Sequence, residues 1–176
     1  MARAFVQPKY QSAQAGRKAL FALDNLWDGI GGLVASDPSV KYLAGKVTIY
    51  SSSPEISRKA MIYYLDMCFG DRKGLITSKN PETCTPEQEK MFKEMFTGAT
   101  YKENYQILNN FVKSHNDTIP PLIHSYIGLS PTMKTFGTTF DPDFGDCYDT
   151  AMMITIDDIY EDKFDRYVAS YDKQNA

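Results

Sequence analysis

The sequence predicts one α/β domain in which a mixed sheet carries helices on both faces. A strand, a long amphipathic helix and a second strand occupy residues 3–50. Capped helical segments follow, and two more strands joined by turn-forming residues stand near the end. This order is typical of a sheet covered by helices. The 176 residues suffice for one domain with a sizeable core, so we expect a single domain over residues 1–176.

The first predicted unit is a strand, a helix and a second strand. Residues 3–8 predict a strand that Pro8 ends, because proline cannot donate to a ladder. Apolar residues three and four apart predict a helix over about 16–35. Residues 40–50 predict the next strand, with Gly45 as the expected site of a bulge. The compact connection favours a parallel pair with a right-handed crossover.

Three glycines interrupt the second half of the helix at 16–35. Gly29, Gly31 and Gly32 each cost roughly 1 kcal/mol relative to alanine inside a helix. We therefore expect the helix to pack closely against a neighbouring backbone there.

A second helix is predicted from Ser53-Pro54-Glu55 to about Phe69. The proline is expected at the first helical position, with the acid beside the positive end of the helix. An irregular polar connection over residues 70–84 follows. The residues expected to be buried on this helix are Ala60, Met61, Tyr64, Leu65 and Cys68.

Capping boxes predict two further helices, which end near residues 96 and 112. The boxes are Thr85 with Gln88 and Thr100 with Glu103. Pro120-Pro121 then begins a short helix, "PPLIHSYIGL".

The last predicted elements are two strands and a helix. The strands span 133–140 and 148–156, and the turn-forming segment "DPDFGD" joins them. Asp158 with Glu161 is expected to cap the final helix.

Composition narrows the function classes. The longest apolar runs are a few residues and no signal-peptide pattern is visible, so neither a spanning helix nor export is expected. Cys68, Cys84 and Cys147 are odd in number and widely spaced, which argues against a disulfide framework or a zinc site and for a reducing cytoplasm. A nucleic-acid binder is usually more basic than this chain, whose net charge is -3.

The charge is unevenly spread along the chain. Residues 1–60 hold eight Lys or Arg against four acids, and the remainder is acidic. A basic first third suits an anionic ligand or an acidic partner, although a solvated mixed surface explains the charge equally well.

The loop before the helix at 16–35 is the first candidate site. It places unpaired backbone N–H groups at the positive end of the helix, where a phosphate fits. Small residues would let the phosphate approach, with Arg17 and Lys18 beside them. The same features also suit an ordinary turn, so the loop alone leaves both interpretations open.

The segment "VQPKYQSAQAG" resembles the acyl-CoA signature of the GNAT acyltransferase superfamily, which reads Gln/Arg-x-x-Gly-x-Gly/Ala after a strand. Gln11 matches its first position and Gly16 its last, while Gln14 replaces its middle glycine. More widely, "ARAFVQPKYQ", "LFALDNLWDGIG", "VKYLAGKVTIY", "IPPLIHSYIGLSP" and "DPDFGD" together resemble the hemolysin-like GNAT N-acyltransferases, relatives of the ornithine-lipid and glycine-lipid synthases. In that family another half precedes the first strand. The resemblance therefore implies the C-terminal portion of a GNAT-like acyltransferase fold, without its N-terminal half.

The resemblance also implies an activity. It is transfer of a (3-hydroxy)acyl group from acyl carrier protein or CoA to the amine of an amino acid of the glycine or ornithine class, for aminolipid synthesis. The acyl-phosphopantetheine would be a donor substrate and not a resident cofactor. Acyl carrier protein is acidic, and Lys9, Arg17 and Lys18 stand near the expected mouth. Peripheral membrane contact is left open.

The same resemblance implies where the donor would bind. A backbone N–H of the first strand would polarise the thioester carbonyl, and the pantetheine arm would lie between that strand and residues 46–50. The residues implied for the carbonyl are Phe5, Val6 and Gln7, and those implied for the phosphate are Gln11, Ser12, Ala13, Gln14, Ala15, Gly16 and Arg17.

Proton transfer has three candidate residues: His124, Ser125 and Tyr126. Each also has a structural interpretation, since His124 can pack beside the Pro-Pro turn and Tyr126 can lie in the core. No metal site is expected, because the acidic segment 141–146 lacks the alternating ligands and terminal Glu of a calcium loop. Cys147 lacks the surroundings of a nucleophile.

Three functions stay open at this point. The first is an N-acyltransferase, and the second is a non-catalytic remnant that binds acyl carrier protein or CoA or pairs with a separate N-terminal half. The third is an acetyl-CoA-dependent N-acetyltransferase, which a short acyl pocket would favour. A pore-forming toxin is not supported, because no amphipathic membrane segment is present.

Overall fold

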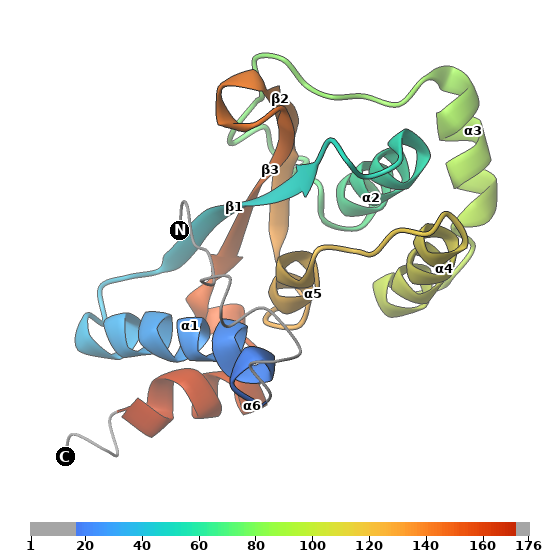
Figure 1. Cartoon of the computed structure of the whole chain (residues 1–176). Helices are drawn as coiled ribbons and strands as arrows, with labels where there is room; N and C mark the ends of the chain where they lie inside the picture. Colours follow the sequence, from blue (N-terminus) through green and yellow to red (C-terminus); the bar gives the residue numbers. More distant parts are fainter. Residues whose placement is uncertain (1–16, 172–176) are drawn as a thin grey trace.

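The computed structural model describes residues 17–171, with side chains from Asp24 onward. In this range an antiparallel three-stranded sheet is flanked by helices (Figure 1). The elements are α1 (Arg17–Ser36), β1 (Tyr42–Tyr50), α2 (Glu55–Phe69), α3 (Pro86–Met95), α4 (Tyr101–Ser114), α5 (Pro121–Ile127), β2 (Lys134–Asp141), β3 (Cys147–Thr155) and α6 (Glu161–Phe164), which continues into a π-helical turn, Asp165–Ala169. The predicted α/β class is confirmed.

The central strand of the described sheet is β3, with β1 and β2 on either side. β1 pairs with β3 in unbroken register, and Gly45 sits opposite Met152. The register between β2 and β3 shifts between Thr135 and Thr138, where Gly137 has a φ of +84°. The bulge predicted at Gly45 is therefore wrong, because the irregularity falls at the glycine whose backbone is in the left-handed region.

The strand predicted at residues 3–8 lies outside the described residues. The predicted parallel pairing of that strand with residues 40–50 stays a prediction for the same reason. Within residues 17–171, β1 pairs with β3 antiparallel.

The main core lies between the sheet and α2, and α4 and α5 extend it (Figure 1). Ala60, Met61, Tyr64 and Leu65 are buried as predicted, whereas Cys68 is only half-buried. The Tyr64 hydroxyl donates to the backbone carbonyl of Tyr101 at 2.9 Å, so α2 is tied to the start of α4.

Helix α1 packs against the final helical segment, α6 and the π-helical turn (Figure 1). A Cβ added to Gly31 would lie 1.8 Å from the backbone oxygen of Tyr167, and one added to Gly32 would lie 3.0 Å from the Tyr171 ring. Gly29 has open space around it. The predicted close backbone approach is thus confirmed at Gly31 alone.

The structure differs in how far it agrees with the predicted N-terminal caps of α3, α4 and α2. Thr85 and Gln88 form the complete capping box. Thr100 accepts from the N–H of Glu103 at 3.2 Å, but the Glu103 carboxylate accepts from Ala99, one residue earlier than a box requires. α2 begins at Glu55, with Pro54 as its cap residue and no side-chain cap.

The predicted cap of the last helix is wrong. α6 begins after Tyr160, whose N–H donates to the Leu129 carbonyl at 2.9 Å. The carboxylate of Asp158 accepts instead from the Thr132 hydroxyl at 2.5 Å. The side chain of Asp158, which the local pattern predicted to cap the helix, is therefore used in a tertiary hydrogen bond with Thr132.

In the described part of the chain, no helix combines the length and the apolar character that crossing a membrane requires.

Candidate functional site

A pocket of about 420 Å³ opens between α4, α5 and the start of α6, and we call it the α4–α5–α6 pocket. This volume is in the usual range for sites that bind small molecules or cofactors. Its lining residues are Tyr101, Lys102, Tyr105, Gln106, His124, Ile127, Gly128, Tyr160, Asp162 and Lys163.

Two tyrosine hydroxyls meet at the wall of this pocket. Tyr101 Oη and Tyr160 Oη lie 2.5 Å apart. Burial, and then this hydrogen bond, raise the pKa of Tyr101 to about 12. The Tyr101 hydroxyl is therefore protonated at neutral pH and can donate a hydrogen bond, but it cannot act as a base.

The three predicted proton-transfer residues point in different directions, because successive residues of a helix are turned by about 100°. His124 is exposed, lines the pocket and has its ring 5.6 Å from the ring of Tyr105. The Ser125 hydroxyl donates to the Pro121 carbonyl at 3.2 Å. Tyr126 is 2% exposed and meets Trp27 edge-on. Of the three, only His124 faces the pocket.

The pocket combines aromatic walls with positive charge. Lys102 Nζ lies 5.9 Å from the ring centre of Tyr101 and 5.7 Å from that of Tyr160. Lys163 adds a second ammonium, whose Nζ lies 3.8 Å from the carboxylate of Asp162. Such a site suits an elongated, partly apolar ligand that carries an anionic group.

Sequence reasoning missed Lys102, Lys163 and Tyr160. Lys102 lies about sixty positions before Tyr160 and Lys163 in the sequence, and the fold brings the three residues together. No local motif predicts such a long-range contact. The only available signal was that Tyr101 and Lys102 open a helix with a strong cap, where side chains are commonly exposed.

The residues predicted to bind the donor lie mostly outside the described part of the chain. These are Phe5, Val6 and Gln7 and the loop from Gln11 to Gly16, and Arg17 is the first residue of α1. The described contacts of α1 do fix its neighbours: Trp27 packs on Tyr126 of α5. Asp24 accepts from the Tyr167 hydroxyl at 2.5 Å and pairs with Arg166. α1 is therefore held by α5 and by the final helical segment, the same elements that line the pocket.

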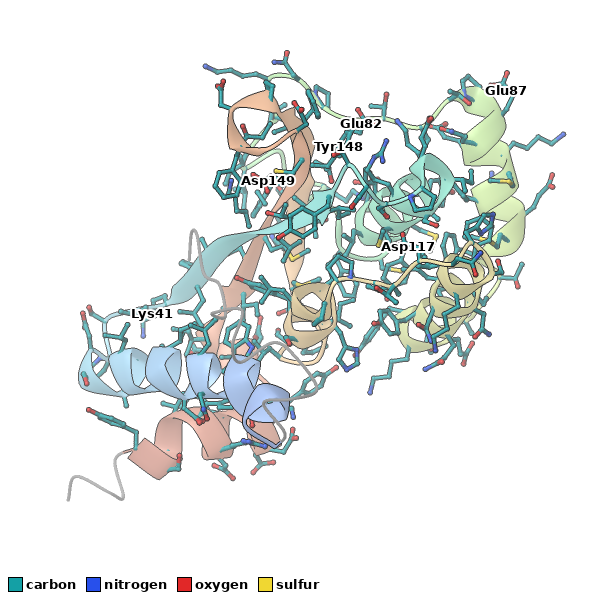
Figure 2. All side chains as sticks on the ribbon, in the orientation of Figure 1. Lys41, Glu82, Glu87, Asp117, Tyr148 and Asp149 are labelled. Carbon is teal, nitrogen blue, oxygen red and sulfur yellow. The ribbon has the colours of Figure 1, made fainter. Side chains whose placement is uncertain are left out.

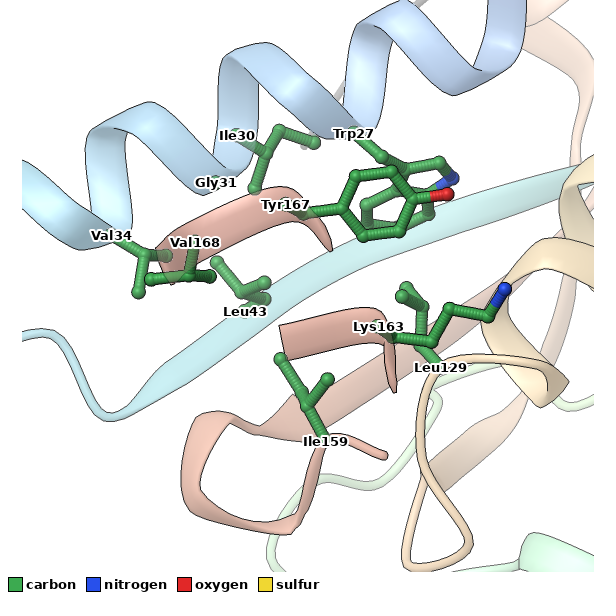
Figure 3. Close-up of a pocket in the computed structure, with 10 residues that line it drawn as sticks. All are labelled: Trp27, Ile30, Gly31, Val34, Leu43, Leu129, Ile159, Lys163, Tyr167 and Val168. Atoms are coloured by element: carbon green, nitrogen blue, oxygen red, sulfur yellow. The ribbon is translucent and has the colours of Figure 1, made fainter. Parts of the chain in front are cut away.

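A second, smaller cavity lies between α1, β1 and the final helical segment (Figure 3). Its volume is about 20 Å³ and its lining is almost wholly apolar, including Trp27, Ile30 and Val168. Lys163 lines both cavities, but in Figure 3 its amine points away from the apolar side chains. A space of this size holds at most one water molecule, so we assign it to packing.

A polar cluster lies on one face of the sheet. Asp149 is 7% exposed, accepts from the Thr48 hydroxyl at 2.6 Å and pairs with Lys46. The hydrogen bond to Asp149 raises the pKa of Lys46. Because both carboxylate oxygens of Asp149 are occupied, the cluster holds β1 to β3 and offers no free acid or base.

No group of three or more His, Cys, Asp or Glu side chains in the part of the chain that the structure describes is arranged to hold a metal ion. The acidic segment after β2 is a turn, as the sequence predicts, with Pro142–Phe144 in a 3-10 helix. Burial raises the pKa of the Cys147 thiol, which disfavours the thiolate that a nucleophile requires.

Comparison with known proteins identifies two curated bacterial relatives. The glycine N(alpha)-acyltransferase of Phocaeicola vulgatus is 43% identical over 175 residues, which are 99% of this chain and 53% of that protein. The glycine N(alpha)-acyltransferase of Bacteroides thetaiotaomicron is 43% identical over 171 residues, 97% of this chain and 50% of that protein. The chain thus spans about half the length of the curated relatives it matches. No family model and no solved structure matches it.

Proposed function

We propose that this chain, a relative of bacterial glycine N(alpha)-acyltransferases along nearly all of its length, takes part in transferring an acyl group to the amine of glycine. The observation that carries the proposal is the 43% identity over 175 residues. Because the chain spans about half of each relative, we assign to it the steps that its own residues can support.

Amide formation from a thioester has three requirements. The carbonyl must be held, its developing oxyanion must be stabilised and a proton must leave the amine. The amine nitrogen attacks the thioester carbon, the C–N bond forms and the C–S bond breaks. The proton lost by the amine is finally returned to the thiolate that leaves.

His124 is the proton acceptor in this proposal. Its imidazole is exposed and borders the α4–α5–α6 pocket. Tyr101, whose hydroxyl is hydrogen-bonded to that of Tyr160, lines the same pocket and stays protonated at neutral pH because its pKa is raised, so it is suited to donate to an oxyanion or to the leaving group. Ser125 and Tyr126 have no part here, since the first bonds its own helix and the second is buried.

The donor in this proposal is a 3-hydroxyacyl group on acyl carrier protein or CoA, and the product serves aminolipid synthesis. Lys102 and Lys163 support an anionic carrier, and the aromatic walls support the apolar part of its arm. We retain the loop from Gln11 to Arg17 as the phosphate site, because α1 is attached to the elements that line the pocket.

A second candidate function is donor binding without transfer by this chain alone. The observation that favours it is the coverage, since half of each relative has no counterpart among these 176 residues. A transfer reaction needs both substrates in one site, and the half of the relatives that this chain does not match can supply the acceptor side.

One assay tests both candidates. The purified chain is incubated with 3-hydroxyacyl carrier protein and glycine, and N-acylglycine is measured by mass spectrometry. The Phocaeicola vulgatus relative is the positive control, and a third reaction adds the segment of that relative that this chain does not match. Product from the chain, alone or with that segment, supports the enzyme. Donor binding without product in either reaction supports the second function, and neither binding nor product overturns both.

A further inference from the structure

Arg58, in the first turns of α2, carries a buried guanidinium that has few partners among the described residues. The residue is 8% exposed. Its Nη1 donates to the Ser53 carbonyl at 3.0 Å, and its guanidinium carbon lies 4.1 Å from the ring centre of Tyr148, labelled in Figure 2. Its Nε is buried and has no hydrogen-bond partner among the described residues.

The neighbouring residue shows what a satisfied buried cation looks like in this fold. Lys59 is also 8% exposed, but its Nζ pairs with Glu82 at 2.5 Å and donates to the Thr83 carbonyl. Within residues 17–171, Arg58 forms no ion pair. The nearby carboxylate of Asp117 instead accepts from the Ser53 hydroxyl. A guanidinium stays protonated, so burying one without a counter-ion is costly.

The contacts of Arg58 leave one edge of its guanidinium to be considered. Nη1 is taken by Ser53, and one face of the guanidinium is covered by Tyr148. The edge beside Nη1 consists of Nε, which has no partner among the described residues, and Nη2, and the two parallel N–H groups of such an edge match the two oxygens of a carboxylate or phosphate. The two contacts hold the guanidinium in place before any anion arrives.

We propose that Arg58 is an oxyanion-binding residue of the acyl-transfer site. This inference rests on the proposed function, because that reaction brings two oxyanions to the chain: the carboxylate of the amino-acid acceptor and the phosphate of the donor arm. Both would form the same paired hydrogen bonds with Nε and Nη2.

The position of Arg58 determines where the reaction would take place if it binds the acceptor carboxylate, and where if it binds the donor phosphate. Arg58 precedes Tyr64 by about 9 Å along α2. The Tyr64 ring is 6.0 Å from Tyr105, whose ring is 5.6 Å from His124. Glycine is too short to reach from Arg58 to the α4–α5–α6 pocket. A carboxylate at Arg58 would therefore place the amine, and the group that deprotonates it, away from His124. A phosphate at Arg58 would let an extended donor arm reach the pocket, and Arg58 would then replace the loop from Gln11 to Arg17 as the phosphate site.

The test is a binding measurement by calorimetry on the purified chain with two pairs of ligands. Glycine is compared with glycinamide, and 4'-phosphopantetheine with pantetheine, since each pair differs in the anionic group alone. We expect one anionic ligand to bind roughly 10- to 100-fold more tightly than its neutral partner, because a charge-assisted bond is lost. In Arg58→Gln this difference should vanish. The matched control is Arg72→Gln, which removes an exposed arginine paired with Asp66 and should keep it.

A second readout separates this role from a structural one. Without ligand, Arg58→Gln should unfold at the same temperature as the unchanged chain or higher, because it removes a buried charge that has no ion pair among the described residues. If Arg58→Gln does not fold, Arg58→Lys keeps the charge, loses the paired geometry and should weaken anion binding at least several-fold.

The inference is overturned if neither anion binds more tightly than its neutral partner. It is equally overturned if Arg58→Gln or Arg58→Lys binds the anion as the unchanged chain does, or if Arg58→Gln folds but melts at a clearly lower temperature. None of these readouts needs acyl transfer. A chain that binds the anion through Arg58 but forms no N-acylglycine, alone or with the unmatched segment of the relative, would refute acyl transfer and leave the anion-binding role of Arg58 standing.

Discussion

Gly31 lies so close to Tyr167 that a Cβ at position 31 would sit 1.8 Å from the backbone carbonyl oxygen of that residue. Helix α1 and the final helical segment therefore touch backbone to backbone. The same two segments are joined by Asp24, which accepts from the Tyr167 hydroxyl and pairs with Arg166. This contact positions α1 beside the elements that line the α4–α5–α6 pocket.

Replacing Gly31 by alanine should destabilise the chain. The new methyl group meets backbone that cannot rotate away, so the two helices must move apart, and we expect a loss of about 3 kcal/mol in the free energy of unfolding. Urea denaturation followed by circular dichroism measures it. The matched control is Gly29→Ala, which meets nothing within 4 Å and should stabilise by up to about 1 kcal/mol. Equal effects of the two substitutions would contradict the close contact.

Replacing Tyr160 by phenylalanine should lower the free energy of unfolding by an amount that depends on pH. The hydrogen bond with Tyr101 contributes about 1 kcal/mol. In the folded chain the pKa of Tyr101 is about 12, above its usual value of 10, so this contribution is complete below pH 10 and lost as the pH rises to 12.

The difference in the free energy of unfolding between the unchanged chain and Tyr160→Phe should therefore shrink between pH 10 and pH 12. Tyr50→Phe, at an exposed position, is the control and should change stability little at any pH. A Tyr160→Phe difference that stays constant over this range would count against the hydroxyl pair.

Asp149→Asn should lower the free energy of unfolding by about 2 kcal/mol, because it removes the charge-assisted bonds of a buried carboxylate with Lys46 and Thr48. Chemical denaturation measures the loss. Asp157→Asn changes an exposed acid and should cost little. If the two substitutions cost the same, the sheet cluster is not holding β1 to β3.

His124→Gln should reduce the rate of N-acylglycine formation by about 100-fold or more while leaving the folded state intact, if His124 accepts the proton as proposed. The other histidine supplies the control: His115 packs on Phe111 with ring centres 4.5 Å apart, and His115→Gln should keep the rate. An unchanged rate in His124→Gln would move proton transfer away from this pocket, and the surroundings of Arg58 would be the next place to examine.

Short-range patterns predicted most of the described fold. The capping box at Thr85 and the apolar periodicity of α1 and α2 depend on residues three and four positions apart, so a pattern in the sequence can predict them. Predictions failed where a distant residue took over a local role. Asp158 is held by Thr132, and the sheet bulges at Gly137 instead of Gly45.

The candidate site was less predictable than the fold. The sequence pointed to three consecutive residues on α5, but the helix turns them apart and leaves only His124 at the pocket. Lys163 and Tyr160 reach the same pocket from the far end of the chain. No motif pointed to Arg58, because what distinguishes it is a buried guanidinium without an ion pair among the described residues, which only the tertiary structure shows.

By itself, the sequence determined which segments become helices and strands, since periodicity, caps and turn formers act over a few residues. It also carried the 43% identity to two curated glycine N(alpha)-acyltransferases over about half of their length. The tertiary structure decided which side chains meet across the fold: the approach of Gly31 to Tyr167, the hydroxyl pair of Tyr101 and Tyr160, and the buried guanidinium of Arg58, which has no ion pair among the described residues. The physical reason is that burial and charge pairing depend on neighbours brought together from distant parts of the chain, which a linear pattern does not encode.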